Sequence, residues 1–366
     1  MAHGGLNVTI IGAGIVGYAV AYELASRGAS IRLVDPRGAG LGATRASAGM
    51  LAPHIEGHSP ELLKLSVCGD AVYDGFVSRV QADAGMPIEY RRIGTLQVAL
   101  TPTEAAALQS LSAQLKIAGV THDLLDATAV RQLEPGLDEG ASLGLHIPAH
   151  GYVAAAQMTS ALAEAMRRKG VTLTAAAVEQ LAASGGRLRV TTSDDAFESD
   201  AVVVAAGSWS GQLMVPPVPV RPIRGQLLRL RLPEPPLSRI VWGGSCYLVP
   251  WTDGSVLVGA TVEDVGFDES ATVQGVQQLL ANAEALLPAL NGARFNEVRV
   301  GLRPQTPDEL PVIGASSTMR GVYYATGHYR NGVLLAPLTA LMLADLMIDR
   351  RERQELSLVT PARFGL

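Results

Sequence analysis

The sequence predicts an α/β protein, α+β overall, that combines a Rossmann-like nucleotide-binding domain with a discontinuous domain built on a mostly antiparallel sheet. Two observations lead to this prediction. A strand, a glycine-rich turn, a helix and a second strand follow one another between Val8 and Asp35. Further along the chain, a second set of strands follows a proline-rich stretch at residues 216–222, which indicates a separate sheet.

The N-terminal unit begins with a β-branched run at residues 8–11, which is typical of a buried parallel strand. A helix is expected over residues 15–27 and a second strand over residues 31–34, which ends at Asp35. The turn between the first strand and the helix has the spacing G-x-G-x-x-G, formed by Gly12, Gly14 and Gly17.

Each glycine of this turn has its own physical role. Gly12 permits the tight turn, Gly14 lets the backbone approach a pyrophosphate, and Gly17 lets the helix pack closely on the strand. The phosphates would then face the free N–H groups of the helix start. Asp35 is placed to accept hydrogen bonds from ribose hydroxyls and would repel a 2′-phosphate, so FAD or NAD fits and NADP does not.

The middle of the chain returns to the nucleotide-binding domain. Residues 157–169 have helical spacing, and strands are expected at residues 171–173, 188–192 and 201–205. The last of these strands ends in Ala206 and Gly207, a glycine that we count among the cofactor-binding residues.

The remaining segments are assigned to the second domain. They include a helix at residues 103–118 and strands at residues 226–232, 247–250 and 255–260. The expected domains are a nucleotide-binding domain (residues 1–85, 146–222 and 300–366) and a substrate-binding domain (residues 86–145 and 223–299).

Composition narrows the classes of ligand. The chain has 366 residues, is 48% hydrophobic and carries a formal net charge of −5, so it can bury a large core and has no cationic excess for nucleic acid. Cys68 and Cys246 are far apart and the histidines form no cluster at metal-ligand spacing, so neither a disulfide framework nor a metal site is expected. A small-molecule ligand is the better expectation.

Two apolar stretches resemble membrane or export segments. Residues 8–24 lack a cationic leader and a cleavage site, which favours a cytoplasmic protein. Residues 333–348 are short for a bilayer span and contain Pro337 and Asp345, so we interpret them as a buried helix and expect no membrane span.

Two later segments favour FAD over NAD. Residues 43–50 are mostly small, which suits a backbone that lies flat beside an extended cofactor. Residues 325–332 lead into the late apolar helix, whose positive end is expected to point at the pyrimidine edge of a flavin, where reduced flavin is negatively charged.

With these segments in place, the sequence resembles the D-amino acid oxidase family of flavoproteins, and within it the glycine oxidases linked to thiamine biosynthesis. The similarity covers nearly the whole chain. It is strongest at residues 12–17, 46–51, 246–250, 258–261, 301–304 and 327–337.

The resemblance implies a set of site residues. Arg303 and Tyr247 would bind the substrate carboxylate. The alternative for Arg303 is an ion pair on the surface, and the alternative for Tyr247 is a purely structural role as a core aromatic. Arg330 would stabilise reduced flavin or close the pocket, or else pair on the surface. Val262 stands beside the substrate where glycine oxidases often have methionine, and the residues expected to line FAD are Ile15, Val16, Asp35, Pro36, Ala43, Thr44, Ala48, Gly49, Met50, Val178, His328, Tyr329, Arg330, Asn331, Gly332, Val333 and Leu334.

The reaction implied is an FAD-dependent oxidation of glycine, sarcosine or small D-amino acids, with hydride transfer to flavin N5. The products would be an imine or 2-oxo acid, ammonia and, with dioxygen as acceptor, hydrogen peroxide; the imine would also suit thiamine thiazole synthesis. Residues 301–314 lack the cysteine of relatives with covalent flavin, so FAD is expected to be non-covalent, in a homo-oligomer. The alternatives are a dehydrogenase for D-amino or 2-hydroxy acids with another acceptor, and a non-catalytic flavin or nucleotide binder.

Overall fold

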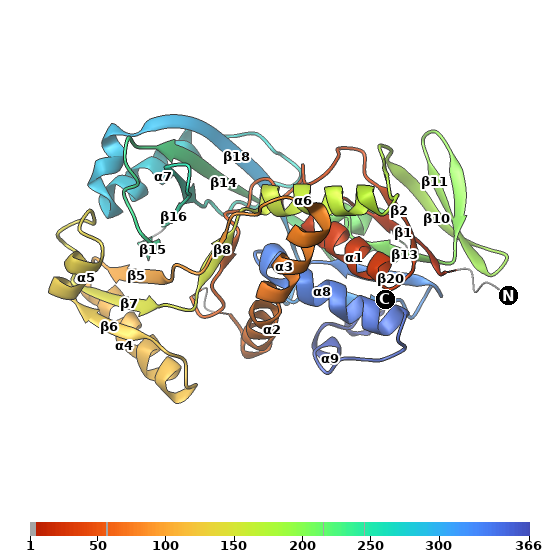
Figure 1. Ribbon diagram of the computed structural model, residues 1–366, viewed down its shortest axis with the longest axis horizontal. Coiled ribbons are helices and arrows are strands. Elements are labelled where there is room, and N and C mark those ends of the chain that lie inside the picture. Colours follow the sequence, from red (N-terminus) through yellow and green to blue (C-terminus); the bar gives the residue numbers. More distant parts are fainter. Residues whose placement is uncertain (1–4, 56–57, 215, 245) are drawn as a thin grey trace.

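The computed structural model describes residues 5–55, 58–214, 216–244 and 246–366, and two halves of the molecule lie side by side along its long axis (Figure 1). A six-stranded sheet forms the centre of one half. All its neighbouring strands are parallel except the β19–β20 pair. The strand order is β19 (Val312–Ala315), β20 (Val322–Thr326), β13 (Ala201–Val204), β1 (Asn7–Ile11), β2 (Ser30–Val34) and β9 (Leu173–Thr174).

Helices cover one face of this sheet, because its parallel strands are connected by crossovers. Apolar side chains from these helices form one large core with the sheet. The helices are α1 (Ile15–Ser26), α2 (Pro60–Ala71), α3 (Tyr73–Ala84), α6 (Ala155–Arg168) and α8 (Gly332–Met347), with α9 (Leu356–Val359) beside β19.

The opposite face is covered by a small antiparallel sheet of β10 (Val178–Ser184), β11 (Arg187–Thr192) and β12 (Ala196–Ser199). Leu188 and Val190 of β11 pack with Val202 and Val204 of β13 in a second core. The central strands are therefore buried on both faces, which explains their continuous apolar sequence.

The other half is built on an eight-stranded sheet whose pairs are antiparallel except β15–β5. Its order is β18 (Arg294–Gln305), β14 (Arg221–Arg231), β17 (Ser255–Gly259), β16 (Cys246–Pro250), β15 (Ile240–Gly243), β5 (Thr95–Ala99), β7 (Leu143–Ile147) and β6 (Asp123–Asp126). The helices of this half are α4 (Pro102–Ile117), α5 (Ala127–Leu133) and α7 (Val273–Leu286).

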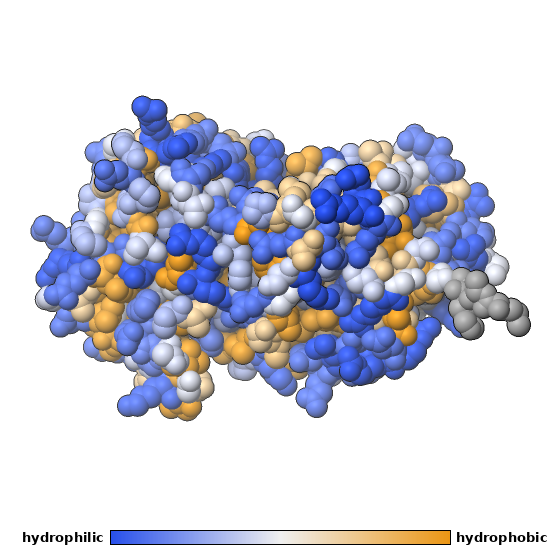
Figure 2. All heavy atoms as spheres, viewed as in Figure 1, coloured by the Kyte–Doolittle hydropathy of each residue, from blue (hydrophilic) through white to orange (hydrophobic). Residues whose placement is uncertain are grey.

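Short elements complete the fold. They are the three-stranded sheet of β3 (Met50–Leu51), β8 (Gly151–Val153) and β4 (Tyr90–Arg91), and the 3₁₀ turns η1 (Gly207–Gln212), η2 (Pro288–Gly292) and η3 (Pro361–Phe364). On the face in Figure 2, hydrophilic side chains are spread over both halves with apolar residues between them. Within the described ranges, no helix is both long and apolar enough to cross a bilayer.

The fold class is as predicted, and one expected strand differs in its bounds. The strand expected at residues 171–173 is only β9 (Leu173–Thr174), whereas the strand expected at residues 188–192 is present as β11 of the small antiparallel sheet. The domain division stays a prediction, and strands β14 and β18 run across its expected boundaries near residues 222 and 300.

Candidate functional site

A cavity of about 600 Å³ lies where the central strands end and the two halves meet. Gly12 follows β1, Asp35 follows β2 and Ala205 follows β13, and all three residues line the cavity. Residues of β16 and β18 from the eight-stranded sheet form its other wall. This position, beyond the carboxyl ends of parallel strands, is the usual ligand site of open α/β sheets.

Backbone geometry explains two glycines of the first turn. Gly12 has a φ of 111°, and a Cβ there would lie 2.3 Å from the carbonyl oxygen of Ala205. A Cβ on Gly17 would lie 2.0 Å from the carbonyl oxygen of Gly12, so helix α1 packs directly on its own entry turn. Neither position tolerates a larger residue without a backbone shift.

The start of α1 is open toward the cavity. Gly14 is its N-cap and offers no side-chain cap, and the first turn has no acidic residue. The Ile15 N–H donates to Thr44 Oγ1 over 3.1 Å, which ties the helix start to residues 43–50. These features fit an anionic group, because unsatisfied N–H groups and the helix dipole favour negative charge.

Asp35 links the glycine turn to the residues that follow β2. Its Oδ2 accepts from the Ala13 N–H (2.8 Å), and its Oδ1 accepts from the N–H groups of Arg37 (2.7 Å) and Gly38 (3.2 Å). The carboxylate lines the cavity in this fixed orientation, as a ribose-binding acid requires.

The turn before α8 forms another part of the wall. The Tyr329 N–H donates to the Pro304 carbonyl over 2.9 Å, which joins this turn to β18. His328 is buried and its Nε2 lies 2.9 Å from Thr339 Oγ1. Burial lowers the pKa of His328 to about 3, so this residue brings no positive charge to the site at neutral pH.

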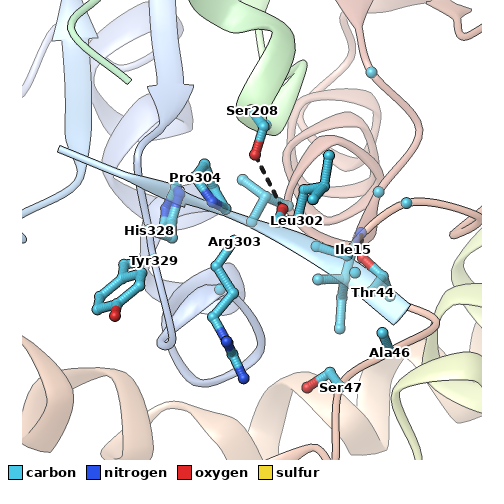
Figure 3. A pocket seen from close by; sticks show the side chains of 18 of the residues that line it. Ile15, Thr44, Ala46, Ser47, Ser208, Leu302, Arg303, Pro304, His328 and Tyr329 are labelled. Atoms are coloured by element: carbon cyan, nitrogen blue, oxygen red, sulfur yellow. Dashed lines mark hydrogen bonds between the residues drawn. The ribbon is translucent and has the colours of Figure 1, made fainter. Parts of the chain in front are cut away.

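Arg303 extends from β18 into the cavity, opposite Ser47 (Figure 3). Its Nη1 donates to the carbonyl oxygens of Thr261 (2.9 Å) and Arg224 (3.4 Å). In the described part of the chain, no carboxylate lies within ion-pair distance of this guanidinium. A part-buried cation without a protein counterion suits a ligand carboxylate.

Tyr247 of β16 also lines the cavity. Its ring covers Gly259 of β17, where a Cβ would lie 2.3 Å from Tyr247 Oη. On its other side, Trp242 of β15 packs against it with ring centroids 5.3 Å apart. Cys246 also lines the cavity, and burial raises the pKa of its thiol to about 12, which keeps it protonated.

Arg330 and Val262 lie at the exposed rim of the cavity. Val262 is 55% exposed. The Arg330 guanidinium carbon lies 4.9 Å from the centre of the Tyr329 ring, and its Nη2 donates to Tyr329 Oη over 3.3 Å. The structure therefore places Arg330 on the neighbouring aromatic ring of its own turn.

Most of the predicted site residues meet in this one cavity. Arg303, Tyr247, Val262, Arg330 and the small segment at residues 43–50 all contribute to its wall. Three predicted cofactor residues do not line it: Gly17 packs within the turn, Asn331 is the buried N-cap of α8, and Leu334 lies in the helical core.

Several residues of the cavity wall lie outside the set predicted from the sequence. Arg37 and Trp209 both line the cavity, with the Arg37 guanidinium carbon 4.0 Å from the Trp209 ring centre. Arg37 follows Asp35 by two residues, a position that could have drawn attention to it. Trp209 and Trp242 had no such signal, since only strand and turn pairing brings them here.

Two sequence comparisons show which known proteins this chain is similar to. Residues 7–346 match the family described as FAD dependent oxidoreductase. The bifunctional protein ThiO/ThiG of Synechocystis sp. is 36% identical over 367 residues, covering 98% of this chain and 54% of that protein. The chain thus spans about half the length of this curated relative.

A second relative matches along nearly its full length. The glycine oxidase of Geobacillus kaustophilus is 32% identical over 353 residues, which are 94% of this chain and 93% of that protein. The crystal structure of glycine oxidase from the same organism superposes with a TM-score of 0.91 and covers 95% of this chain and 96% of that one. An iminodiacetate oxidase from Chelativorans sp. superposes with a TM-score of 0.89 at 28% identity, covering 97% and 98%.

Proposed function

Since the chain belongs to the FAD dependent oxidoreductase family, we propose that it oxidises glycine or another small amino acid at the Cα–N bond. The observation that carries this proposal is Arg303, a part-buried guanidinium that extends into the cavity and has no described carboxylate as a counterion. The glycine oxidase names of the full-length relative and of the structural neighbour support the same substrate class.

The residues that would hold FAD lie along the cavity wall. The open start of α1 would bind the pyrophosphate and Asp35 the ribose of the adenosine part. Residues 43–50 and the turn before α8 would flank the flavin. When bound, FAD supplies the two-electron acceptor of the reaction.

Arg303 and Tyr247 would position the substrate. A planar guanidinium makes a two-point contact with a carboxylate, and the Tyr247 hydroxyl would add a third. This grip fixes the direction of the Cα–H bond, so orientation supplies much of the catalysis. His328 stays neutral beside the start of α8, so the helix dipole and the Arg330 guanidinium would supply the positive field at this end of the cavity.

The overall reaction removes two electrons and two protons from the Cα–N unit. Dioxygen would accept them as hydrogen peroxide, and water would hydrolyse the imine to a 2-oxo acid and ammonia. We also propose that the imine feeds thiamine thiazole synthesis, a role suggested by the match to the ThiO/ThiG protein. We further propose that the protein acts as a homo-oligomer in the cytoplasm.

An anaerobic absorbance titration with glycine, sarcosine, D-alanine, D-proline and a 2-hydroxy acid tests this function. Bleaching of the flavin by the amines, with fast recovery and peroxide on readmission of air, is the expected result. Slow recovery would indicate a dehydrogenase with another acceptor, and bleaching by the hydroxy acid alone would replace the proposed substrate class.

The Arg303→Ala variant tests the residue that carries the proposal. Loss of the guanidinium should lower kcat/KM for glycine by about a hundredfold or more, because the substrate carboxylate then enters without a partner. FAD content should stay at the wild-type level. Arg320→Ala, an exposed arginine outside the cavity wall, is the control and should leave kcat/KM unchanged. Unchanged turnover in Arg303→Ala would favour a non-catalytic flavin binder.

A further inference from the structure

A segment between β17 and α7, residues 261–270, crosses from the eight-stranded sheet to the nucleotide-binding half; we call it the strap. Near its start, Val262 lines the exposed rim of the cavity. Further along, the Phe267 ring packs on Trp209 with centroids 5.5 Å apart, and Glu269 accepts from Arg37 Nη1 over 2.8 Å. Both of these partners line the cavity, so the strap is attached on both sides of it.

The first residue of the strap holds the substrate-binding arginine of the proposed function. The Thr261 carbonyl accepts the 2.9 Å hydrogen bond from Arg303 Nη1. Thr261 is itself fixed on Gln226 of β14: its N–H donates to the Gln226 carbonyl (3.1 Å), and its Oγ1 accepts from the Gln226 N–H (2.8 Å). The direction of the Arg303 side chain thus depends on where this carbonyl lies.

A charge cluster around the buried Arg224 fixes the strap beside Thr261. Arg224 of β14 is 3% exposed and donates from Nη2 to Glu263 (2.6 Å) and from Nη1 to Asp268 (2.5 Å). Backbone hydrogen bonds join Arg224 and Glu263 in both directions, at 2.8 and 3.0 Å. The other oxygen of Glu263 accepts from Thr261 Oγ1 (2.5 Å) and from Gln226 Nε2 (2.8 Å).

Glu263 is the one member of this cluster that contacts Arg224, Gln226 and Thr261 together. Removing a carboxylate from a buried guanidinium leaves a charge that the surrounding structure must rearrange to satisfy. The nearest consequence of such a rearrangement is movement of Thr261, whose carbonyl is the acceptor for Arg303.

We propose that Glu263, held by Arg224, is a positioning residue that orients Arg303 toward the substrate carboxylate. This inference rests on the proposed function of Arg303. Nη1 of Arg303 donates to the Thr261 carbonyl, so the other N–H groups of the guanidinium stay available for a two-point contact with the carboxylate. A guanidinium that points in another direction would weaken carboxylate binding, while the cavity residues of the nucleotide-binding half would be unchanged.

The test uses Glu263→Gln, which keeps the side-chain shape, in the FAD-loaded protein. We expect KM for glycine and the Kd of acetate, measured by isothermal titration calorimetry, to rise about tenfold. FAD content and kcat should stay within about twofold of wild type. Asp264→Asn is the matched control. Asp264 also lies on the strap, but the substitution removes only its exposed ion pair with Arg221 of β14, so it should change neither constant.

The same substitution in the Arg303→Ala background separates this inference from the proposed function. If Glu263 acts through Arg303, it should have no further effect on acetate binding in that background. An equal rise in Kd in both backgrounds, or none in the single variant, would overturn the positioning role. If Arg303→Ala itself leaves acetate binding unchanged, the proposed function fails instead. If Glu263→Gln lowers the thermal unfolding midpoint, Glu263→Asp replaces it, because this variant keeps a carboxylate for Arg224 but shortens its reach to Thr261 and Gln226.

Discussion

At Gly225 of β14, the absence of a side chain leaves the space that the Arg303 guanidinium occupies. A Cβ at this position would lie 2.3 Å from Nη2 and 2.4 Å from Cζ of Arg303. Gly259 makes the same room for the Tyr247 ring. These two glycines, on neighbouring strands of the eight-stranded sheet, therefore set where the polar side chains of the cavity lie.

Gly225→Ala should displace the end of the Arg303 side chain and leave the fold intact, because a flexible guanidinium moves more easily than backbone. A misplacement of this size should lower kcat/KM for glycine by about a hundredfold, with FAD content unchanged. Steady-state kinetics measures this effect. Gly75→Ala, in an open position of α3, is the control and should have wild-type kinetics; wild-type kinetics in both variants would contradict the prediction.

At the scale of elements, α1 and α8 are held together at their C-terminal ends by one buried carboxylate. Asp345 of α8 is 1% exposed and accepts from Arg27 (2.7 Å), Arg353 (2.6 Å) and Arg351 (2.8 Å). Burial would raise the pKa of Asp345, but hydrogen bonds from the three arginines outweigh it and hold the pKa below its usual value. We call Asp345 and its three arginines the clamp. Both helices begin at the cavity, so the clamp fixes the C-terminal ends of two helices whose N-terminal ends form part of the site.

Asp345→Asn should lower the free energy of unfolding by about 1–3 kcal/mol, because the arginines lose their shared anion but keep access to solvent. Urea unfolding at neutral pH provides the measurement. Asp349→Asn removes a second, half-exposed partner of Arg27 and should cost less than about 1 kcal/mol. Equal losses in the two variants would show that burial of Asp345 is not what makes the clamp stable.

For the whole molecule, buried histidines make stability depend on pH. Burial lowers the pKa of His150 to about 3, that of His328 to about 3 and that of His58 to about 4, and it also lowers the pKa of His54. His150, His328 and His58 are therefore neutral in the folded protein over the physiological range. In the unfolded chain their pKa values return to about 6.5, so the unfolded state binds more protons as the pH falls below that value.

The free energy of unfolding should therefore fall between pH 7.5 and pH 5.5. The expected decrease is about 1.4 kcal/mol for each fully buried histidine, or close to 3 kcal/mol for His150 and His328 together. Urea denaturation at the two pH values measures it. His150→Gln should reduce this pH dependence by about 1.4 kcal/mol. A stability that does not change with pH would be incompatible with neutral burial of both rings.

Local sequence predicted the elements whose physics is local. The β1–α1–β2 unit, its glycine turn and Asp35 were all predicted, because each depends on residues close along the chain. The buried helix α8 was recognised from its length and composition. For the same reason, nearly all of the residues expected to hold the cofactor line the cavity, since they belong to contiguous segments that enter it together.

Tertiary structure decided what depends on pairing between distant segments. A strand was predicted at residues 188–192, and the fold decides that this strand, β11, pairs antiparallel with β10 and β12 and covers the central sheet from outside. The contacts of Arg303 with Thr261, Gly225 and the Arg224–Glu263 cluster join β18 to β14 and the strap, and no local pattern specifies them. The sequence by itself determined that this chain builds a dinucleotide cavity, because backbone conformation follows from neighbouring residues. Only the register of distant strands decided which side chains meet in that cavity, because long-range packing sets the positions and orientations of those side chains.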